Sequence, residues 1–466
     1  MKRYNYKTNI LYKLSLVILI TMFSCKTDFL DEKPNSSIVV PQNLADIAAF
    51  LDNTSEVNKT GGLGQMGADE YDFVDYAAWQ STFTAMERNS FIWANDIYEG
   101  YSPVQDWAAP FWSVYYANNA LESLKNLDLH ESTEANNVKG WALFVRAYAY
   151  HDLVRNFCLA YDSKTAETDL GLPIRLEPRV DLLQPRSNLK KTYEQIIIDL
   201  QNSATLLASN FQETNRNRPS KTAAYALLAR VYLMMNDFEN AETNADKALS
   251  LYNKLIDYNT ISTSDPIPFK RDNDETIFNA SQFGVHGITF TDRGNTATII
   301  NPIIISSYGK NDLRLFVYFE RKDNGRYAKK VGYNGNGVNP FHGLAVDELY
   351  LIKAECLARK GENVLSLKWL NDLLIKRFKN TEVFVPVTAN STDELLDIIL
   401  NERIKELIWR GIRWSDIKRL NKIGKEIVLK RLLNGKEYIL PPNDVRYAFP
   451  IPEEEISLSK VEQNPR

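Results

Sequence analysis

Carboxylates and aromatic rings gather in one short stretch that lies early in the chain. Its four carboxylates, Asp69, Glu70, Asp72 and Asp75, lie beside the polar-edged rings of Tyr71, Tyr76 and Trp79. Two carboxyl groups held a fixed distance apart can hydrolyse a glycosidic bond, but closeness in sequence does not set that distance. Carboxylates also accept hydrogen bonds from sugar hydroxyls while a ring stacks on the apolar face of the sugar. The stretch therefore favours binding over catalysis, with a solvated loop as the alternative.

The usual signatures of catalysis and of metal or nucleotide binding are missing. Residues 62–67 read Gly-Leu-Gly-Gln-Met-Gly and fit GxGxxG, but no strand precedes them and no helix opens within them, so we expect a flexible loop. The four histidines, at positions 130, 151, 286 and 342, form neither HExxH nor a pair at helical spacing that could hold zinc. We expect no catalytic residue, no metal site and no cofactor. For His151 we expect a core or interhelical hydrogen-bonding role.

Charged residues of both signs alternate near the C-terminal end of the chain. They are Glu402, Arg403, Glu406, Arg410, Arg413, Asp416 and Arg419, with Trp409 and Trp414 between them. Opposite charges three or four residues apart support a helix. We expect a structural ion network here and not a ligand site.

The bulk composition excludes one class of partner and favours another. The chain has 466 residues, with 55 basic against 59 acidic residues and a net charge of -4, so it lacks the positive field that holds nucleic acid. A hydrophobic content of 44% is enough to bury a large core. The 24 Tyr and 8 Trp residues offer apolar faces with a polar edge, which sugars and peptides bind, although most of these rings are expected in the core.

Paired amphipathic helices are the elements that must position these residues. A proline and the capping-type residue Ser220 precede a long helical run that breaks at Asn236-Asp237. Small and apolar residues on both sides of the break follow the register of a tetratricopeptide repeat, in which small residues let two helices approach closely. A degenerate second copy runs over residues 347–374 with a turn at Gly361, and a third first helix lies around residues 143–150.

Unequal spacers separate these copies, so we expect a helical scaffold with long inserts and not a regular array. The two largest inserts run from about residue 54 to 109 and from about 257 to 343, and both are rich in Gly, Asn, Asp and aromatic residues. Long inserts of this kind usually hold function. Short strand-like runs lie inside the second insert at Thr276-Ile277-Phe278 and Thr298-Ile299-Ile300. The expected fold class is mainly α, with a tetratricopeptide-like scaffold, loop-rich inserts and a few short strands.

The N-terminal segment predicts export and lipid anchoring. Basic residues precede a short apolar run, which is typical of a secretory signal peptide over residues 1–24. Cys25 follows a small residue, where a bacterial lipoprotein is cleaved and acylated, and residues 25–40 are polar and suit a tether. The other two cysteines, Cys158 and Cys356, lie in apolar helical patterns and are expected to be small buried residues. Residues 41–466 then form a single domain.

Several separated segments, taken in order, resemble the SusD/RagB family of Bacteroidetes outer-membrane lipoproteins. The resemblance begins at Cys25 with Phe-Leu-Asp and a proline, and continues through the aromatic helix of residues 139–155 and the Gly-Leu-Pro-Ile segment at 171–174. The C-terminal part is the most specific, with Gly411, Arg413-Trp414 and a closing Phe-Pro-Ile-Pro at 449–452. The chain departs from the family pattern at Arg410, Ile412 and Arg466. We expect these departures to alter only local helix contacts.

The resemblance implies a mostly α fold on the cell surface, anchored to the outer membrane by lipid. It implies that the protein caps a SusC-like TonB-dependent barrel and delivers glycans to it, while some relatives handle peptides. The family has no sequence motif for its ligand residues, so our binding candidates come from the aromatic and charged content of the two inserts. They are Asp69, Tyr71, Trp79, Trp93, Trp107, Arg326 and Tyr327.

Two other functions remain open from the residues alone. The protein could be a structural lid that stabilises the barrel without a ligand of its own, although the aromatic inserts argue against this. A third interpretation is a lipid-anchored glycosidase that uses Asp69 and Asp75. Only an enzyme would release shorter products from a polysaccharide.

Overall fold

The computed structural model describes residues 41–129, 132–209, 215–291 and 296–466. The predicted signal peptide, the lipidation site Cys25 and the tether lie outside these residues. Everything below concerns the compact unit Asn43–Arg466.

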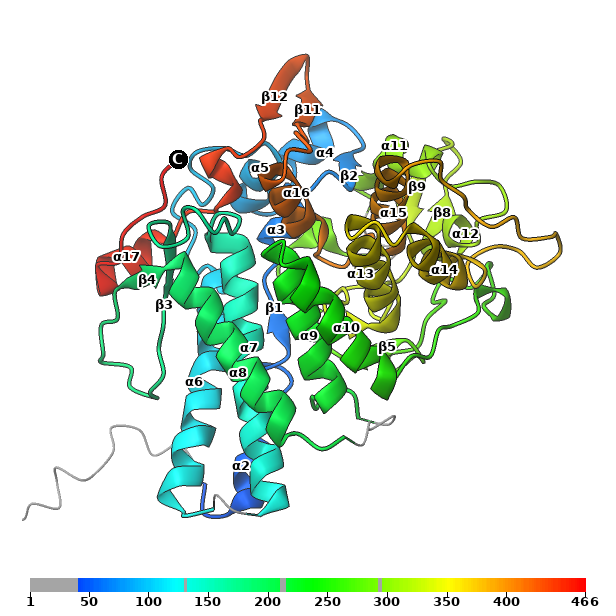
Figure 1. Ribbon diagram of the computed structural model, residues 1–466. Coiled ribbons are helices and arrows are strands. Elements are labelled where there is room, and N and C mark those ends of the chain that lie inside the picture. Colours follow the sequence, from blue (N-terminus) through cyan, green and yellow to red (C-terminus); the bar gives the residue numbers. More distant parts are fainter. Residues whose placement is uncertain (1–40, 130–131, 210–214, 292–295) are drawn as a thin grey trace, which may run out of the picture. The chain divides into compact units, whose positions relative to one another are not determined.

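Long helices that pack on one another in sequence order form the scaffold (Figure 1). In chain order they are α6 (Gln105–Asn126), α7 (Thr133–Phe157), α8 (Leu189–Leu206), α9 (Lys221–Met234), α10 (Phe238–Leu251), α13 (Val346–Arg359), α14 (Asn363–Leu374) and α15 (Thr392–Glu406). Helix α6 packs on α7, α7 on α8, α8 on α9 and α9 on α10, and α13 then packs on α10, α14 and α15. The predicted fold class, mainly α with a helical-repeat scaffold, is confirmed.

The α9–α10 pair forms where the sequence predicts it. The Ser220 hydroxyl accepts the Ala223 N–H at 3.3 Å and begins α9, and the Asp237 carboxylate accepts the Asn240 N–H at 3.1 Å and begins α10. Asn236 has φ of 58° and makes the turn between the two helices, a conformation that asparagine tolerates. Fully buried alanines line both helices, so the two backbones pack closely.

The second predicted copy is also a helix pair, α13 and α14, and Gly361 with φ of 81° lies in its turn. The third predicted first helix lies within α7, which packs on α8. Cys158, directly after α7, and Cys356, in α13, are buried free thiols, as expected. His151 on α7 is 3% exposed and neither ring nitrogen has a hydrogen-bond partner in the described part of the chain, so it is a core residue.

Short strands tie the two predicted inserts together. Strand β1 (Lys59–Thr60) pairs in parallel with β6 (Ser281–Gln282), and β2 (Tyr71–Phe73) pairs antiparallel with β7 (Thr298–Ile300). Each pair joins one strand from the first insert to one from the second. The other pairs are β3 (Leu170–Pro173) with β4 (Arg186–Asn188), β5 (Thr276–Phe278) with β10 (Leu344–Ala345), β8 (Phe319–Arg321) with β9 (Tyr327–Lys329), and β11 (Leu429–Leu433) with β12 (Lys436–Leu440). Both predicted strands, β5 and β7, are confirmed.

Shorter helices complete the described part of the chain. They are α2 (Leu44–Leu51), α3 (Leu63–Gly67), α4 (Tyr76–Gln80), α5 (Ala85–Phe91), α11 (Pro302–Ser306), α12 (Arg314–Tyr318), α16 (Arg413–Lys422) and α17 (Glu453–Ser459). Within the described ranges, none of the helices combines the length and the apolar character needed to cross a membrane.

The glycine-rich segment is buried, so the prediction of a flexible loop was wrong. Its residues form α3, and the Leu63 N–H donates a hydrogen bond to Asp106 at 3.0 Å inside the protein. The N–H of Gly61, just before the segment, donates to Asp152 at 2.7 Å. Glycine fits here because buried side chains pack against the backbone. A Cβ on Gly62 would lie 2.7 Å from Gln282 Cδ and 2.8 Å from the His286 ring. The protein's own carboxylates thus satisfy the amides that a bound phosphate would contact in a nucleotide site.

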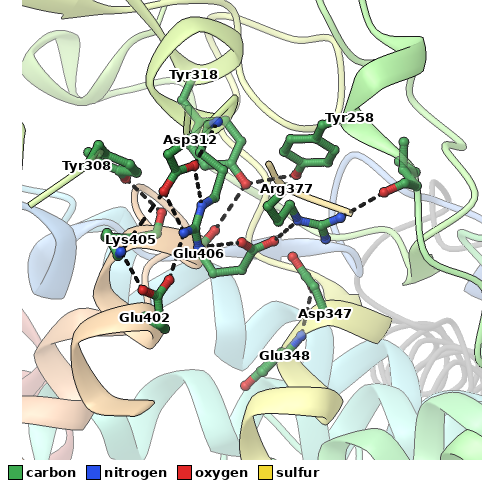
Figure 2. A network of polar contacts seen from close by, with 12 residues as sticks. Tyr258, Tyr308, Asp312, Tyr318, Asp347, Glu348, Arg377, Glu402, Lys405 and Glu406 are labelled. Atoms are coloured by element: carbon green, nitrogen blue, oxygen red, sulfur yellow. Dashed lines mark hydrogen bonds and ion pairs between the residues drawn. The ribbon is translucent and has the colours of Figure 1, made fainter. Parts of the chain in front are cut away.

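The alternating charges near the C-terminal end form the predicted structural ion network, in which Arg403 and Arg419 each bind Asp416 at 2.8 Å. Figure 2 shows the part of it around Glu402 and Glu406. Arg314 binds Asp312 and Glu402 at 2.7 Å each and Glu406 at 3.0 Å. Arg377 binds Glu406 at 2.7 Å. Burial alone would raise the pKa of Glu406, but the charges of Arg377 and Arg314 lower it to about 2. These charged groups are satisfied by one another inside the protein, so the network is structural.

Candidate functional site

Three of the four acidic residues that the sequence singled out have structural hydrogen-bond partners, and the fourth, Asp72, lies 3.6 Å from Arg431. The Asp69 carboxylate accepts two hydrogen bonds from Arg413, each of 2.7 Å, and the charge of Arg413 lowers the Asp69 pKa against the opposing effect of burial. Glu70 accepts the Trp409 N–H at 2.9 Å, and burial raises its pKa to about 7. Asp75 caps α4 by accepting the Ala78 N–H at 2.8 Å. Asp69 and Asp75, the carboxylates of the glycosidase hypothesis, thus serve an ion pair and a helix cap.

Two of the aromatic candidates lie in the core. Tyr71 is 0% exposed and its hydroxyl donates to the Met66 carbonyl at 2.8 Å. Trp93 is 1% exposed and its indole N–H donates to the Gly67 carbonyl at 2.9 Å. The Arg431 guanidinium lies 5.5 Å from the centre of each ring. Neither ring offers a face to solvent in this conformation.

Helix α4 places two rings together at the surface. The Tyr76 and Trp79 rings are stacked, with centroids 5.4 Å apart and an angle of 22° between their planes. The Trp79 ring is half-buried. Its indole N–H donates to the Arg88 carbonyl at 3.2 Å, and this hydrogen bond restricts the orientation of the ring. Tyr76 is 36% exposed. Residues three apart on a helix lie on one face, so the short helix is what brings the rings together.

A third aromatic ring, that of Phe83, lies in the segment that links α4 to α5. Phe83 is 91% exposed, so both faces of its ring are open to solvent. The next residue, Thr84, begins α5 through a capping box with Glu87, in which the Thr84 hydroxyl accepts the Glu87 N–H at 3.2 Å and the Glu87 carboxylate accepts the Thr84 N–H at 3.1 Å. The cap fixes the backbone next to Phe83.

Arg326 reaches this surface from the second insert. Its Nη1 donates to the Val74 carbonyl at 2.8 Å, two residues before α4, and the side chain is exposed. The contact follows from the strands, since β2 leads into α4 and pairs with β7, and β7 packs against β9, which follows Arg326. The structure therefore places one sequence candidate, Arg326, against the segment that leads into α4, the helix that carries a second candidate, Trp79. We call Tyr76, Trp79, Phe83 and Arg326 the α4 patch.

The remaining two binding candidates, Tyr327 and Trp107, line two separate cavities. Tyr327 is half-buried and lines a cavity of about 320 Å³ beside β8 and β9. Trp107, only 3% exposed, lines a cavity of about 260 Å³ between α6 and α17. Trp112 also lines that cavity and is 51% exposed, and the Arg175 guanidinium there lies 4.7 Å from the centre of the Phe111 ring.

The seven candidates chosen from the sequence omit Tyr76, although its stretch was favoured for binding, and sequence reasoning missed Phe83 altogether. The spacing of Tyr76 and Trp79 at i and i+3 after a capping aspartate was a usable signal for Tyr76. No pattern in the sequence marks Phe83 as exposed. Within the described ranges, no group of three or more His, Cys, Asp or Glu side chains could hold a metal ion.

Two family models match separate parts of the chain. A SusD-like model described as "Starch-binding associating with outer membrane" matches residues 28–233, and the SusD/RagB model, described as "SusD family", matches residues 346–466. Among curated proteins, SusD-like protein P2 of Formosa agariphila is 24% identical over 92% of this chain and 96% of its own length. SusD-like protein P38 of the same organism is 21% identical over 68% of this chain and 72% of its own length.

Solved structures share the fold. A putative sugar binding protein from Bacteroides vulgatus superposes with a TM-score of 0.74 at 23% identity, over 92% of this chain and 99% of that one. A SusD superfamily protein from Bacteroides thetaiotaomicron gives 0.73 at 21% identity, over 91% and 100%. A laminarin binding SusD-like protein gives 0.66 at 18% identity, over 90% and 99%. This likeness shows the fold, and the two SusD family models, which together match residues 28–233 and 346–466, show that the chain belongs to the SusD/RagB family.

Proposed function

We propose that this protein binds a glycan at the cell surface through the α4 patch and has no catalytic site. The observation that carries the proposal is the stacked pair of Tyr76 and Trp79 on α4, with the exposed Arg326 bonded to the Val74 carbonyl two residues before that helix. A flat aromatic face next to a hydrogen-bonding charged group is the combination that a sugar ring requires. The family description "Starch-binding" and the sugar-binding and laminarin-binding names of proteins with this fold support a glycan as the ligand class.

Binding at this patch uses side chains that are already held in place. The hydrogen bond from Trp79 to Arg88 and the stacking with Tyr76 restrict both rings before the ligand arrives. Little rotamer entropy is then lost when a sugar stacks on the exposed ring face. Arg326 uses one nitrogen to contact the Val74 carbonyl and has further N–H groups for sugar hydroxyls. The exposed carboxylate of Asp75 can accept a hydroxyl next to the rings.

Catalysis is not part of the proposal, because Asp69, one of the two carboxylates that a glycosidase would need, is engaged in an ion pair. The Asp69 carboxylate is held by both nitrogens of Arg413, and its lowered pKa keeps it ionised and unable to act as a general acid. Incubation with polysaccharides checks this part directly. Release of shorter products would support a glycosidase instead.

Anchoring and delivery complete the proposed function. Cleavage after residue 24 and acylation of Cys25 would attach the protein to the outer membrane, with residues 25–40 as the tether. From there it would pass the glycan to a SusC-like TonB-dependent barrel. Mass spectrometry of the mature protein tests the acylation. Co-purification of the protein with the SusC-like barrel from the membrane tests the partnership.

Calorimetry with a panel of oligosaccharides and peptides tests the α4 patch. We expect at least one glycan to bind, and Trp79→Ala to weaken it about tenfold, since a buried aromatic contact is worth about 1.4 kcal/mol or more. The matched control is Trp112→Ala, which removes an exposed tryptophan from the cavity beside α6. It should leave the affinity unchanged.

The other outcomes each favour a different function. If Trp112→Ala weakens binding and Trp79→Ala does not, the ligand lies in the α6 cavity and our site is wrong. Binding of peptides alone would replace the glycan with a peptide ligand. If the folded protein binds neither class, the structural lid becomes the better interpretation.

A further inference from the structure

A polar cavity of about 440 Å³ opens beside β1, and its lining shares no residue with the α4 patch. Its wall comes from the loop after α2, from β1, and from residues near 217, 271–281 and 334–336. Asparagine, serine and threonine side chains make up most of the wall. Two cations, Lys59 and Arg271, line the same cavity. They come from the two inserts, which the β1–β6 pair holds together.

Both cations are held by neutral groups. The Lys59 ammonium donates to the Ser281 hydroxyl at 3.1 Å, and Arg271 donates from Nη2 to the Asn217 side-chain oxygen at 2.9 Å. Neither forms an ion pair with a carboxylate in the described part of the chain. Each keeps N–H groups that these single bonds do not use, since an ammonium has three donors and a guanidinium five.

The two cations also act on each other. Burial lowers the pKa of Lys59, and the positive charge of Arg271 lowers it further, while Glu56 opposes both. Two like charges near a partly buried site leave a positive potential that a bound anion would neutralise. Asp272, next to Arg271 in the sequence, has a carboxylate that accepts a hydrogen bond from the Asn279 amide. The cavity therefore has charge and hydrogen-bonding capacity for an oxyanion.

We propose that this cavity, the Lys59–Arg271 pocket, binds the sulfate or carboxylate group of a charged sugar. The oxyanion lies between the ammonium and the guanidinium and accepts charge-assisted hydrogen bonds from both. The neutral asparagine, serine and threonine groups around it bond the hydroxyls of the sugar ring. The pocket is a site of its own, so its occupancy does not depend on the α4 patch.

Calorimetry at low ionic strength tests the proposal with four probes. They are a sulfated monosaccharide, a uronic acid, the neutral parent sugar and inorganic sulfate. We expect one or both charged sugars to bind at least about tenfold more tightly than the neutral parent, and the affinity to fall as salt rises. Lys59→Met and Arg271→Gln should each weaken the charged sugar about tenfold, because each removes one charged donor. The conservative Lys59→Arg should retain most of the affinity.

Two control variants test whether the binding is specific to the Lys59–Arg271 pocket. Lys125→Met removes an exposed lysine from α6 and should change nothing, and Trp79→Ala should leave binding of the charged sugar intact. Thermal melting shows whether each variant is folded. Equal affinity for charged and neutral sugars, or full affinity in a folded Lys59→Met variant, overturns the proposal. Inorganic sulfate that binds as tightly as the sulfated sugar overturns recognition of the sugar, and loss of binding in Trp79→Ala overturns the independence of the site.

Discussion

Glu355 on α13 gives the sharpest test of the buried charge network. Arg419 on α16 binds both of its oxygens, at 2.8 and 2.7 Å, and Arg359 binds one of them at 2.9 Å. The side chain is 0% exposed. Burial by itself would raise the pKa of Glu355, but Arg419 outweighs burial and lowers the pKa from 4.5 to about 2. The folded protein therefore holds this carboxylate in its ionised form.

The magnitude follows from that pKa. At about 1.4 kcal/mol for each pH unit, a change from 4.5 to about 2 corresponds to roughly 3 kcal/mol of free energy of unfolding. Because the pKa is lower in the folded state, the unfolded state binds more protons in acid. The stabilisation is therefore fully present above pH 4.5 and is lost as the pH falls from 4.5 towards 2. Glu355→Gln should cost about 3 kcal/mol near neutral pH, and the cost should shrink below pH 4.5.

Urea unfolding followed by tryptophan fluorescence, repeated from neutral pH to about pH 3, measures this cost. Glu122→Gln, on the exposed face of α6, is the matched control and should change the free energy of unfolding by less than about 0.5 kcal/mol at every pH. A Glu355→Gln cost below about 1 kcal/mol near neutral pH would refute the reasoning. So would a cost that stays constant as the pH falls.

Two further variants test the backbone of the scaffold by thermal or urea unfolding. Ser220→Ala should lower the free energy of unfolding by about 1 kcal/mol, because it removes the cap of α9, and Ser220→Asp should restore most of it. Gly411→Ala should cost more than about 2 kcal/mol, since Gly411 has φ of 67° and a Cβ there would lie 2.6 Å from the His342 ring. Wild-type stability in either Ala variant would contradict the geometry.

The helix pairs could be predicted because their signals are local. A capping side chain lies three residues from the N–H that it accepts, as at Ser220 and Asp237, and helical periodicity repeats within a few turns. Strands β5 and β7 were predicted for the same reason, as short β-branched and aromatic runs. The partner of β7 was not predicted, because β7 pairs with β2, which lies in the other insert.

The glycine-rich segment shows where local reasoning fails. The GxGxxG match and its polar surroundings indicated a mobile loop, yet the segment is buried against Trp414 and bonded to Asp106 and Asp152. Those carboxylates lie on α6 and α7, far along the chain. A pattern within six residues contains no information about such partners.

The sequence by itself determined the paired-helix scaffold and the family, since periodicity, caps and ordered motifs are properties of neighbouring residues. Only the tertiary structure decided which rings and charges meet water or a ligand. Tyr71 and Tyr76 are five residues apart, but pairing of β2 with β7 buries the first and the turn into α4 exposes the second. Exposure and long-range proximity, as between Lys59 and Arg271, depend on packing of distant segments, which no local pattern records.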